Sequence, residues 1–278
     1  MSATTISYLN SLLDYYTPSS TYFDKARRHR ASIETRLDNR LGVSEMFETG
    51  SLRHGTGVWF YSDVDYIASL KGARPTPTTA LSNVRDALKD RFPNTTIRVS
   101  RPAVVCEFAS GDETVEVVPA FAAPSGGFWI PNPADTAEWM KSHPKDHNSW
   151  VNKSNEKHSG AAKKLARLAK TWKYRRNVPV SSCYLEMRAA KYAGEQSSWI
   201  LPMDLFYFLR NLKNVGLAAM NDPTGLGSRF TACSSTSNRD DALSKLDTAV
   251  SRAQKAYDAY MDGDDATAIA QWKLVFSQ

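Results

Sequence analysis

Two aspartates stand two residues apart at the end of the segment GSLRHGTGVWFYSDVD, which covers residues 50–65. Side chains at positions i and i+2 of a strand point to the same face of a sheet, so Asp63 and Asp65 are expected to project side by side. Two like charges at that spacing repel each other unless a cation lies between them. The expected cation is Mg²⁺, because it prefers hard oxygen ligands and keeps coordination sites open for phosphate. The spacing therefore predicts a metal site, and two ions about 4 Å apart would suit a phosphoryl displacement.

A third carboxylate that would complete such a site is Glu116, in the segment TVEVVPAF. The valines on either side of it predict a buried strand, with Glu116 on one face of that strand. A surface charge on an edge strand explains the same pattern equally well. The strand alone therefore leaves both interpretations of Glu116 open.

The Gly50-Ser51 dipeptide supplies a second chemical function, the binding of phosphate. Glycine lets the backbone come close to a phosphate, and the following amides and the serine hydroxyl can donate to its oxygens. By itself the dipeptide is best explained as an ordinary turn. Together with Gly55-Thr56 and the aspartate pair in one window of sixteen residues, it indicates phosphoryl transfer. His54, inside this window, is expected to be an exposed loop residue.

The elements that would position these residues can be predicted from periodicity and turn residues. Residues 62–70, 95–100, 103–109 and 114–121 have the composition of short strands. A long polar helix is expected to begin at Ser19 or Ser20 and to end at Gly42, and a second helix is expected to begin at Thr78 or Thr79.

From Pro131 onward the strand signal disappears and helical spacing takes its place. A short helix is predicted over 134–142 and a long one over 146–176. Four more helices are predicted over 182–193, 201–213, 240–261 and 265–276. We therefore expect an α+β protein with two domains: residues 1–130, with a mixed sheet and an N-terminal spine helix, and residues 131–278, a helical lobe.

The composition excludes several classes of protein. The net charge of +6 fits a phosphate-bearing partner or an ordinary basic surface, and charge alone does not separate these. Three dispersed cysteines form no C-x-x-C pair, and Pro144 separates His143 from a shared helical turn with His147, so no zinc site is expected. The N-terminus lacks the pattern of a signal peptide, and no apolar run approaches the ~18 residues that span a bilayer. A cytoplasmic protein without membrane contact is the expectation.

These residues resemble a known family. GSLRHGTGVWFYSDVD is similar to the G-S…[DE]-h-[DE] signature of the polymerase-beta nucleotidyltransferase superfamily. Together with VEVVPAF it resembles, more narrowly, the bacterial relatives of cyclic GMP-AMP synthase and oligoadenylate synthetase, the CD-NTases of anti-phage signalling. The segments LARLAKTWKYRRNVPVSSCYLEM, DPTG and DATAIAQWKLVF extend the resemblance over nearly the whole chain.

The resemblance implies a polymerase-beta-like core packed against a C-terminal helical bundle, with the active site in the cleft between them. It implies that Gly50 and Ser51 cradle the donor triphosphate, and that Asp63, Asp65 and Glu116 hold two Mg²⁺ ions, with Mn²⁺ as an alternative. On the helical side it implies phosphate contacts from the residues of a basic pair and from a serine. These are Arg167, Lys170 and Ser182.

The implied activity is the joining of NTPs, with ATP and GTP favoured and pyrimidines open, into a cyclic di- or oligonucleotide with release of pyrophosphate. It also implies an activator, which is a protein, an RNA or a phage product. Two departures from the family stand out: Glu116 replaces the usual aspartate, and Cys183 replaces the aromatic residue that often follows the serine. Two alternatives stay open: an enzyme that makes linear products or modifies an RNA end or a protein, and a catalytically silent nucleotide or nucleic-acid sensor.

Overall fold

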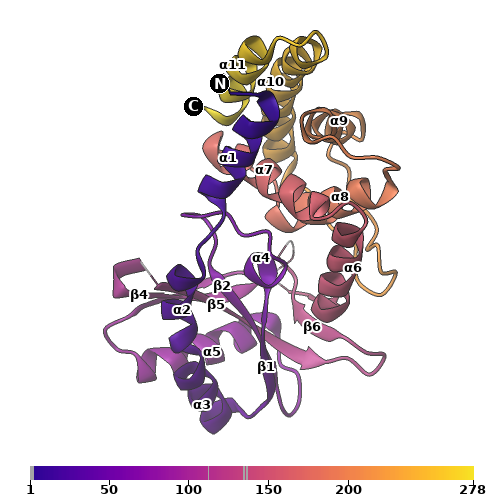
Figure 1. The fold of residues 1–278 in the computed structure, drawn as a ribbon. Helices are drawn as coiled ribbons and strands as arrows, with labels where there is room; N and C mark the ends of the chain where they lie inside the picture. The colour runs from indigo at the N-terminus through magenta and orange to yellow at the C-terminus, as the bar shows by residue number, and fades with distance from the viewer. Residues whose placement is uncertain (1–2, 112, 134, 136) are drawn as a thin grey trace.

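The structure, a computed structural model, describes residues 3–111, 113–133, 135 and 137–278. These residues form a sheet body and a helical body, drawn below and above in Figure 1. The sheet has the order β1-β2-β5-β4-β3, and β5 also pairs with β6, which pairs with β7. The β2–β5 pair is parallel and the other pairs are antiparallel, so the predicted α+β class with a mixed sheet is confirmed. The strands are β1 (Val43–Thr49), β2 (Val64–Leu70), β3 (Thr96–Ser100), β4 (Ala103–Phe108), β5 (Glu113–Ala122), β6 (Phe128–Pro131) and β7 (Trp139–Ser142).

One face of the sheet is covered by the helices α2 (Ser20–Arg28), α3 (Arg30–Leu41) and α5 (Pro77–Arg91). Apolar side chains of these helices, such as Leu37 and Leu88, share a core with Val64 of β2. Because side chains alternate along a strand, Val64 faces this core and Asp65 faces the other way. The packing of one face therefore fixes the direction of the predicted metal ligands.

The helical body is built from α1 (Thr5–Tyr16) and from the helices of the C-terminal half. Leu9 and Leu13 of α1 share one core with Trp172 and Trp272, and Thr5 bonds to Asp265 at 2.7 Å through its hydroxyl. The N-terminal helix therefore lies beside α11, as Figure 1 shows. The C-terminal helices are α6 (Pro144–Glu156), α7 (Ala161–Arg175), α8 (Ser182–Glu195), α9 (Leu201–Asn214), α10 (Thr236–Met261) and α11 (Asp265–Phe276).

Two predicted helices are each divided in the structure. The helix predicted over 146–176 is interrupted between α6 and α7, where Ser159 and Gly160 have φ values of +48° and +101°. Those left-handed values cannot continue a right-handed helix. The long N-terminal helix is divided into α2 and α3 by a turn at His29, whose ring stacks on Phe108 at 3.7 Å and bonds to Glu113.

The helix predicted over 134–142 is wrong, because residues 139–142 form strand β7; residues 134 and 136 lie outside the described part of the chain. Pairing with β6 and the indole of Trp139, which donates to the Pro75 carbonyl at 2.9 Å, favour the extended form. The N-cap of α5 is Thr76, rather than Thr78 or Thr79, because its hydroxyl accepts from the Thr79 amide and Pro77 begins the helix.

The predicted boundary at residue 130 lies within the sheet, because β6 extends to Pro131 and pairs with β7 up to Ser142. Helix α1, although N-terminal, packs with α7, α9 and α11. Among the residues that the structure describes, no helix is both long enough and apolar enough to span a bilayer.

Candidate active site

The predicted carboxylates lie at one end of two neighbouring strands. Asp65 is the second residue of β2, and the parallel register places it beside Glu116 of β5. Asp63 immediately precedes β2. The choice of Glu116 as the third carboxylate therefore has a structural basis: it is the β5 residue that pairs with the second aspartate.

The environment of these carboxylates disfavours their charged forms. Burial and the charge of Asp63 raise the pKa of Glu116 to about 7. Burial raises the pKa of Asp63 to about 6. Burial, followed by the charges of Glu116 and Asp63, holds the pKa of Asp65 well above its ordinary value. A cation among the three groups would relieve this repulsion.

Gly50 fits closely against the Asp65 carboxylate. A Cβ atom built on Gly50 would lie 2.5 Å from Asp65 Cγ, and the φ of Gly50 is +67°. Both facts exclude a side chain at this position. The turn α4 (Gly50–Arg53) therefore begins in contact with a predicted metal ligand, which brings the Ser51 hydroxyl to the same end of the sheet.

The carboxylates fit Mg²⁺ by donor type, since all three offer hard oxygen ligands. The charges of Glu116 and Asp63 both contribute to the raised pKa of Asp65, and the charge of Asp63 contributes to that of Glu116. Within the described ranges, however, no group of three His, Cys, Asp or Glu side chains is arranged as a ready metal site. The fit therefore rests on the oxygen ligands that the three carboxylates offer and on the pairing of Asp65 with Glu116.

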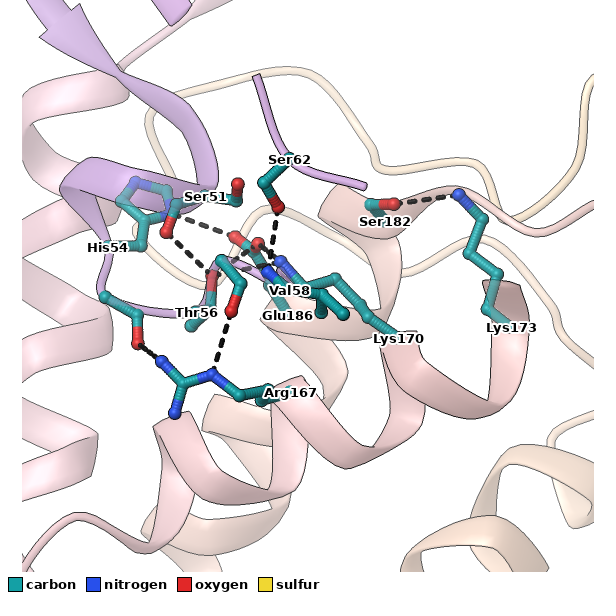
Figure 2. A network of polar contacts seen from close by, with 12 residues as sticks. Ser51, His54, Thr56, Val58, Ser62, Arg167, Lys170, Lys173, Ser182 and Glu186 are labelled. Atoms are coloured by element: carbon teal, nitrogen blue, oxygen red, sulfur yellow. Dashed lines mark hydrogen bonds and ion pairs between the residues drawn. The ribbon is translucent and has the colours of Figure 1, made fainter. Parts of the chain in front are cut away.

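A buried polar network fixes the loop that follows α4 (Figure 2). At its centre is Glu186 of α8, 4% exposed, which accepts from Lys170 Nζ at 2.5 Å, from Thr56 Oγ1 at 2.6 Å and bonds to His54 Nδ1 at 2.9 Å. Burial opposes ionisation of Glu186, but the charge of Lys170 and the bond with His54 outweigh it and hold its pKa well below the ordinary value. His54 is 5% exposed, so the prediction of an exposed loop histidine is wrong.

Arg167 holds the same loop from α7. Its Nε donates to the Gly57 carbonyl and its Nη2 to the Gly55 carbonyl, both at 2.8 Å. Lys170, one turn further on, is 1% exposed and its ammonium is engaged by Glu186 and Thr56. The structure thus places the predicted basic pair against the loop 54–57, where neither cation points to open solvent beside the carboxylates.

Lys173, one further turn along α7, lies with the predicted serine. Its Nζ donates to Ser182 Oγ at 2.8 Å, and Tyr174 Oη lies 3.1 Å from the same oxygen. Burial and the nearby charge of Lys170 lower the pKa of Lys173 to about 8. Tyr61, from the loop before Asp63, stacks on Tyr174 with ring centroids 4.5 Å apart.

Residues that the sequence analysis missed include Glu186 and Lys173, while Thr56 was named there only as part of the Gly55-Thr56 turn. Glu186 had a usable signal, because it is a charged residue inside the apolar run of SCYLEMRAA. The two histidines that were not expected to bind zinc have other roles. His143 precedes α6 as its N-cap residue, and His147 bonds to Asp222 at 2.8 Å.

The family match, together with the fold, identifies the chain as a nucleotidyltransferase. Residues 3–155 match the family model described as the Second Messenger Oligonucleotide or Dinucleotide Synthetase domain, a match that covers more than half of the chain. The chain belongs to this family, and its resemblance to the CD-NTases is confirmed by the match and by the solved structures that share its fold. Among curated proteins, no sequence matches the chain.

Three solved relatives illustrate the shared fold. CdnC of E. coli MS115-1 in a structure with ATP is 17% identical, with a TM-score of 0.78 over 99% of this chain and 98% of that chain. The same relative in a CdnC:HORMA-deltaN complex gives a TM-score of 0.75 at 17% identity, over 98% and 96% of the two chains. The CD-NTase CdnG of Bradyrhizobium diazoefficiens, in complex with GTP, is 14% identical with a TM-score of 0.72, over 99% and 98%. The cyclic AMP-GMP synthase DncV of Vibrio cholerae, in complex with a linear intermediate, is 14% identical with a TM-score of 0.61, over 76% and 63%.

Proposed function

We propose that this protein joins nucleoside triphosphates into a cyclic di- or oligonucleotide and releases pyrophosphate. The observation that carries the proposal is the pairing of Asp65 with Glu116, with Asp65 lying against Gly50 and Asp63 two residues before it in the chain. The family match supports the product class, because the family model is described as a synthetase of second messenger oligonucleotides or dinucleotides.

In this proposal the donor triphosphate binds between the two bodies. The Gly50-Ser51 turn provides backbone amides and a hydroxyl, and Lys173 with Ser182 provides an ammonium and a second hydroxyl from the helical side. Arg167 and Lys170 act through the loop 54–57, which they hold by hydrogen bonds. This division of roles assigns the phosphate contact to Lys173, three residues beyond the lysine that the family resemblance implied.

Two Mg²⁺ ions, or Mn²⁺, would be held by Asp63, Asp65 and Glu116. When bound, such ions activate an attacking hydroxyl and stabilise the leaving oxygen of a phosphoryl displacement. The chain's own contribution is to hold the Asp65 carboxylate near Asp63 and Glu116 despite their repulsion, and to leave room for it by having glycine at position 50.

The chemical step forms one bond and breaks another. The 2′- or 3′-hydroxyl oxygen of the acceptor bonds to the α-phosphorus of the donor, and the bond from that phosphorus to the bridging oxygen breaks. Pyrophosphate leaves with the electron pair of the broken bond, and the hydroxyl proton passes to solvent. Each further bond releases another pyrophosphate in the same way, and the last transfer, within the linear intermediate, closes the ring.

The substrates we propose are ATP and GTP, since relatives of this fold have been solved with each of them. We further propose that the product acts in anti-phage signalling in the cytoplasm, and that an activator controls its synthesis. The complex of the relative CdnC with HORMA-deltaN supports a protein as the activator.

The test is incubation of the purified protein with Mg²⁺ or Mn²⁺ and labelled ATP, GTP, CTP and UTP, followed by phosphatase and chromatography. The Asp63→Asn/Asp65→Asn variant serves as the inactive enzyme, and Asp14→Asn/Asp262→Asn, at two exposed positions, is the matched control. We expect a phosphatase-resistant product with the wild type and the control only. Products that are all phosphatase-sensitive would contradict cyclisation, and no product with either metal and with lysate of phage-infected cells would contradict the enzyme proposal.

A further inference from the structure

A cavity of about 880 Å³ lies on the helical body, between the C-terminal halves of α6 and α8 and the segment 219–229. None of the residues proposed to bind NTP or metal lines it. Its volume falls within the range of small-molecule sites, which is roughly 300–1,000 Å³. The structure therefore contains a concave space that the proposed chemistry does not use.

The lining of this cavity is strongly cationic. Its charged residues are five cations and two carboxylates, Glu195 and Asp222. The Asp222 carboxylate is already engaged by His147 at 2.8 Å and by Thr224. Glu195 lies 3.8 Å from one of the five cations. Positive charge therefore exceeds negative charge in the lining, and four of the five cations are exposed to solvent. The cations are Lys153, Lys157, Arg188, Lys191 and Arg229.

Several of these cations are held in place by neutral backbone acceptors. Arg188 Nη2 donates to the Ala218 carbonyl at 2.9 Å, and Arg229 Nη2 donates to the Ala219 carbonyl at 3.0 Å. These contacts orient the guanidinium groups without neutralising them, and each guanidinium carries five N–H donors. Within the described part of the chain, no carboxylate pairs with Lys153.

We propose that this cavity binds a small polyanion, a molecule with at least two phosphate or carboxylate groups. The anionic groups would be bound by the oriented guanidiniums and by Lys153, and Trp150 would provide a flat apolar wall for the rest of the molecule. We choose a small molecule over a nucleic acid because the site is a cavity between two helices and a loop, with the volume of a small-molecule site. This proposal does not depend on the proposed enzymatic activity.

The test is isothermal titration of the full chain with fructose 1,6-bisphosphate and with inorganic phosphate as probes, in EDTA and at low ionic strength. We expect saturable binding, tighter for the bisphosphate because two anionic groups are bound at once. The Lys153→Ala/Lys191→Ala variant is expected to bind the bisphosphate about tenfold more weakly. These two lysines are chosen because, unlike Arg188 and Arg229, they are not seen to hold a backbone carbonyl in the described part of the chain. In a parallel titration the bisphosphate should change tryptophan fluorescence, and Trp150→Phe should remove that change.

The matched control is Lys89→Ala/Lys255→Ala, which removes two exposed lysines from α5 and α10 and should leave probe affinity unchanged. Equal weakening in both double variants would overturn the proposal, as would the absence of saturable binding of either probe. Loss of ATP affinity in Lys153→Ala/Lys191→Ala would assign the cavity to the substrate cleft. That result would overturn the proposal that the cavity is a separate binding site. Binding of a short DNA duplex that displaces the bisphosphate at equal phosphate concentration would favour a nucleic-acid surface instead.

Discussion

Glu186 connects the helical body to the loop 54–57, and the substitution Glu186→Gln tests how strongly it stabilises that contact. The carboxylate is 4% exposed and contacts Lys170, Thr56 and His54. Glutamine has the same shape but no charge, and its amide nitrogen cannot accept a hydrogen bond. The substitution would therefore leave the Lys170 ammonium buried, 1% exposed and without a counter-ion.

Removing one member of a buried ion pair costs about 3–5 kcal/mol, because the remaining charge has neither water nor a partner. We expect a loss in that range for the free energy of unfolding of Glu186→Gln. The double variant Glu186→Gln/Lys170→Met removes both charges and should recover at least about 2 kcal/mol of that loss. The assay is urea unfolding at pH 7, followed by circular dichroism.

The matched control is Glu195→Gln, the same substitution on the same helix. Glu195 has a side chain that is 62% exposed, with its partner Lys191 at 3.8 Å, so its loss should cost less than about 1 kcal/mol. A cost below about 1 kcal/mol for Glu186→Gln would refute the reasoning. Additive losses in the double variant would refute it as well, because they would show that Glu186 and Lys170 do not stabilise each other.

Three further outcomes are expected. Gly50→Ala should reduce product formation at least about a hundredfold, since its Cβ would displace the Asp65 carboxylate; Gly72→Ala, at an open positive-φ position, is the control for backbone strain. The pKa values of Asp63 and Glu116 are raised in the folded state, to about 6 and about 7. Ionisation of these two carboxyl groups as pH rises therefore lowers the free energy of unfolding. Thermal unfolding in EDTA should therefore occur at lower temperature at pH 8 than at pH 5, and Mg²⁺ should reverse the loss. Lys173→Met should raise the KM for the donor NTP about tenfold with little change in the unfolding temperature, and an unchanged KM would contradict its phosphate contact.

The sheet side of the site could be predicted from the sequence because its geometry is local. The two-residue period of a strand predicts the direction of Asp65, and the valines around Glu116 identify its strand; Asp63 lies immediately before β2, where this period no longer applies. What the sequence did not contain is the register, which places Asp65 beside Glu116. That pairing depends on which strands are neighbours and in which direction they run.

On the helical side, the sequence could predict which basic residues lie close together on α7, but not the role of each. Arg167, Lys170 and Lys173 follow one another at intervals of three along α7, so periodicity places them on neighbouring turns and does not rank them. Their roles differ because of what lies opposite: two carbonyls for the first, Glu186 for the second and Ser182 for the third. Strand β7 was missed for a similar reason, since its four residues are held by pairing with β6 and only Trp139 among them favours a strand.

The position of the buried network has a consequence for how the two bodies work together. The sheet supplies the carboxylates and Gly50, but the loop between them is held by Glu186, Lys170 and Arg167, all from α7 and α8. Burying so many polar groups is tolerable only when each has its partner, so the loop adopts this shape only while the helices lie against it. The conformation of the loop 54–57 therefore depends on both bodies. A shift of α7 and α8 relative to the sheet would disturb the site without moving any of the predicted metal ligands.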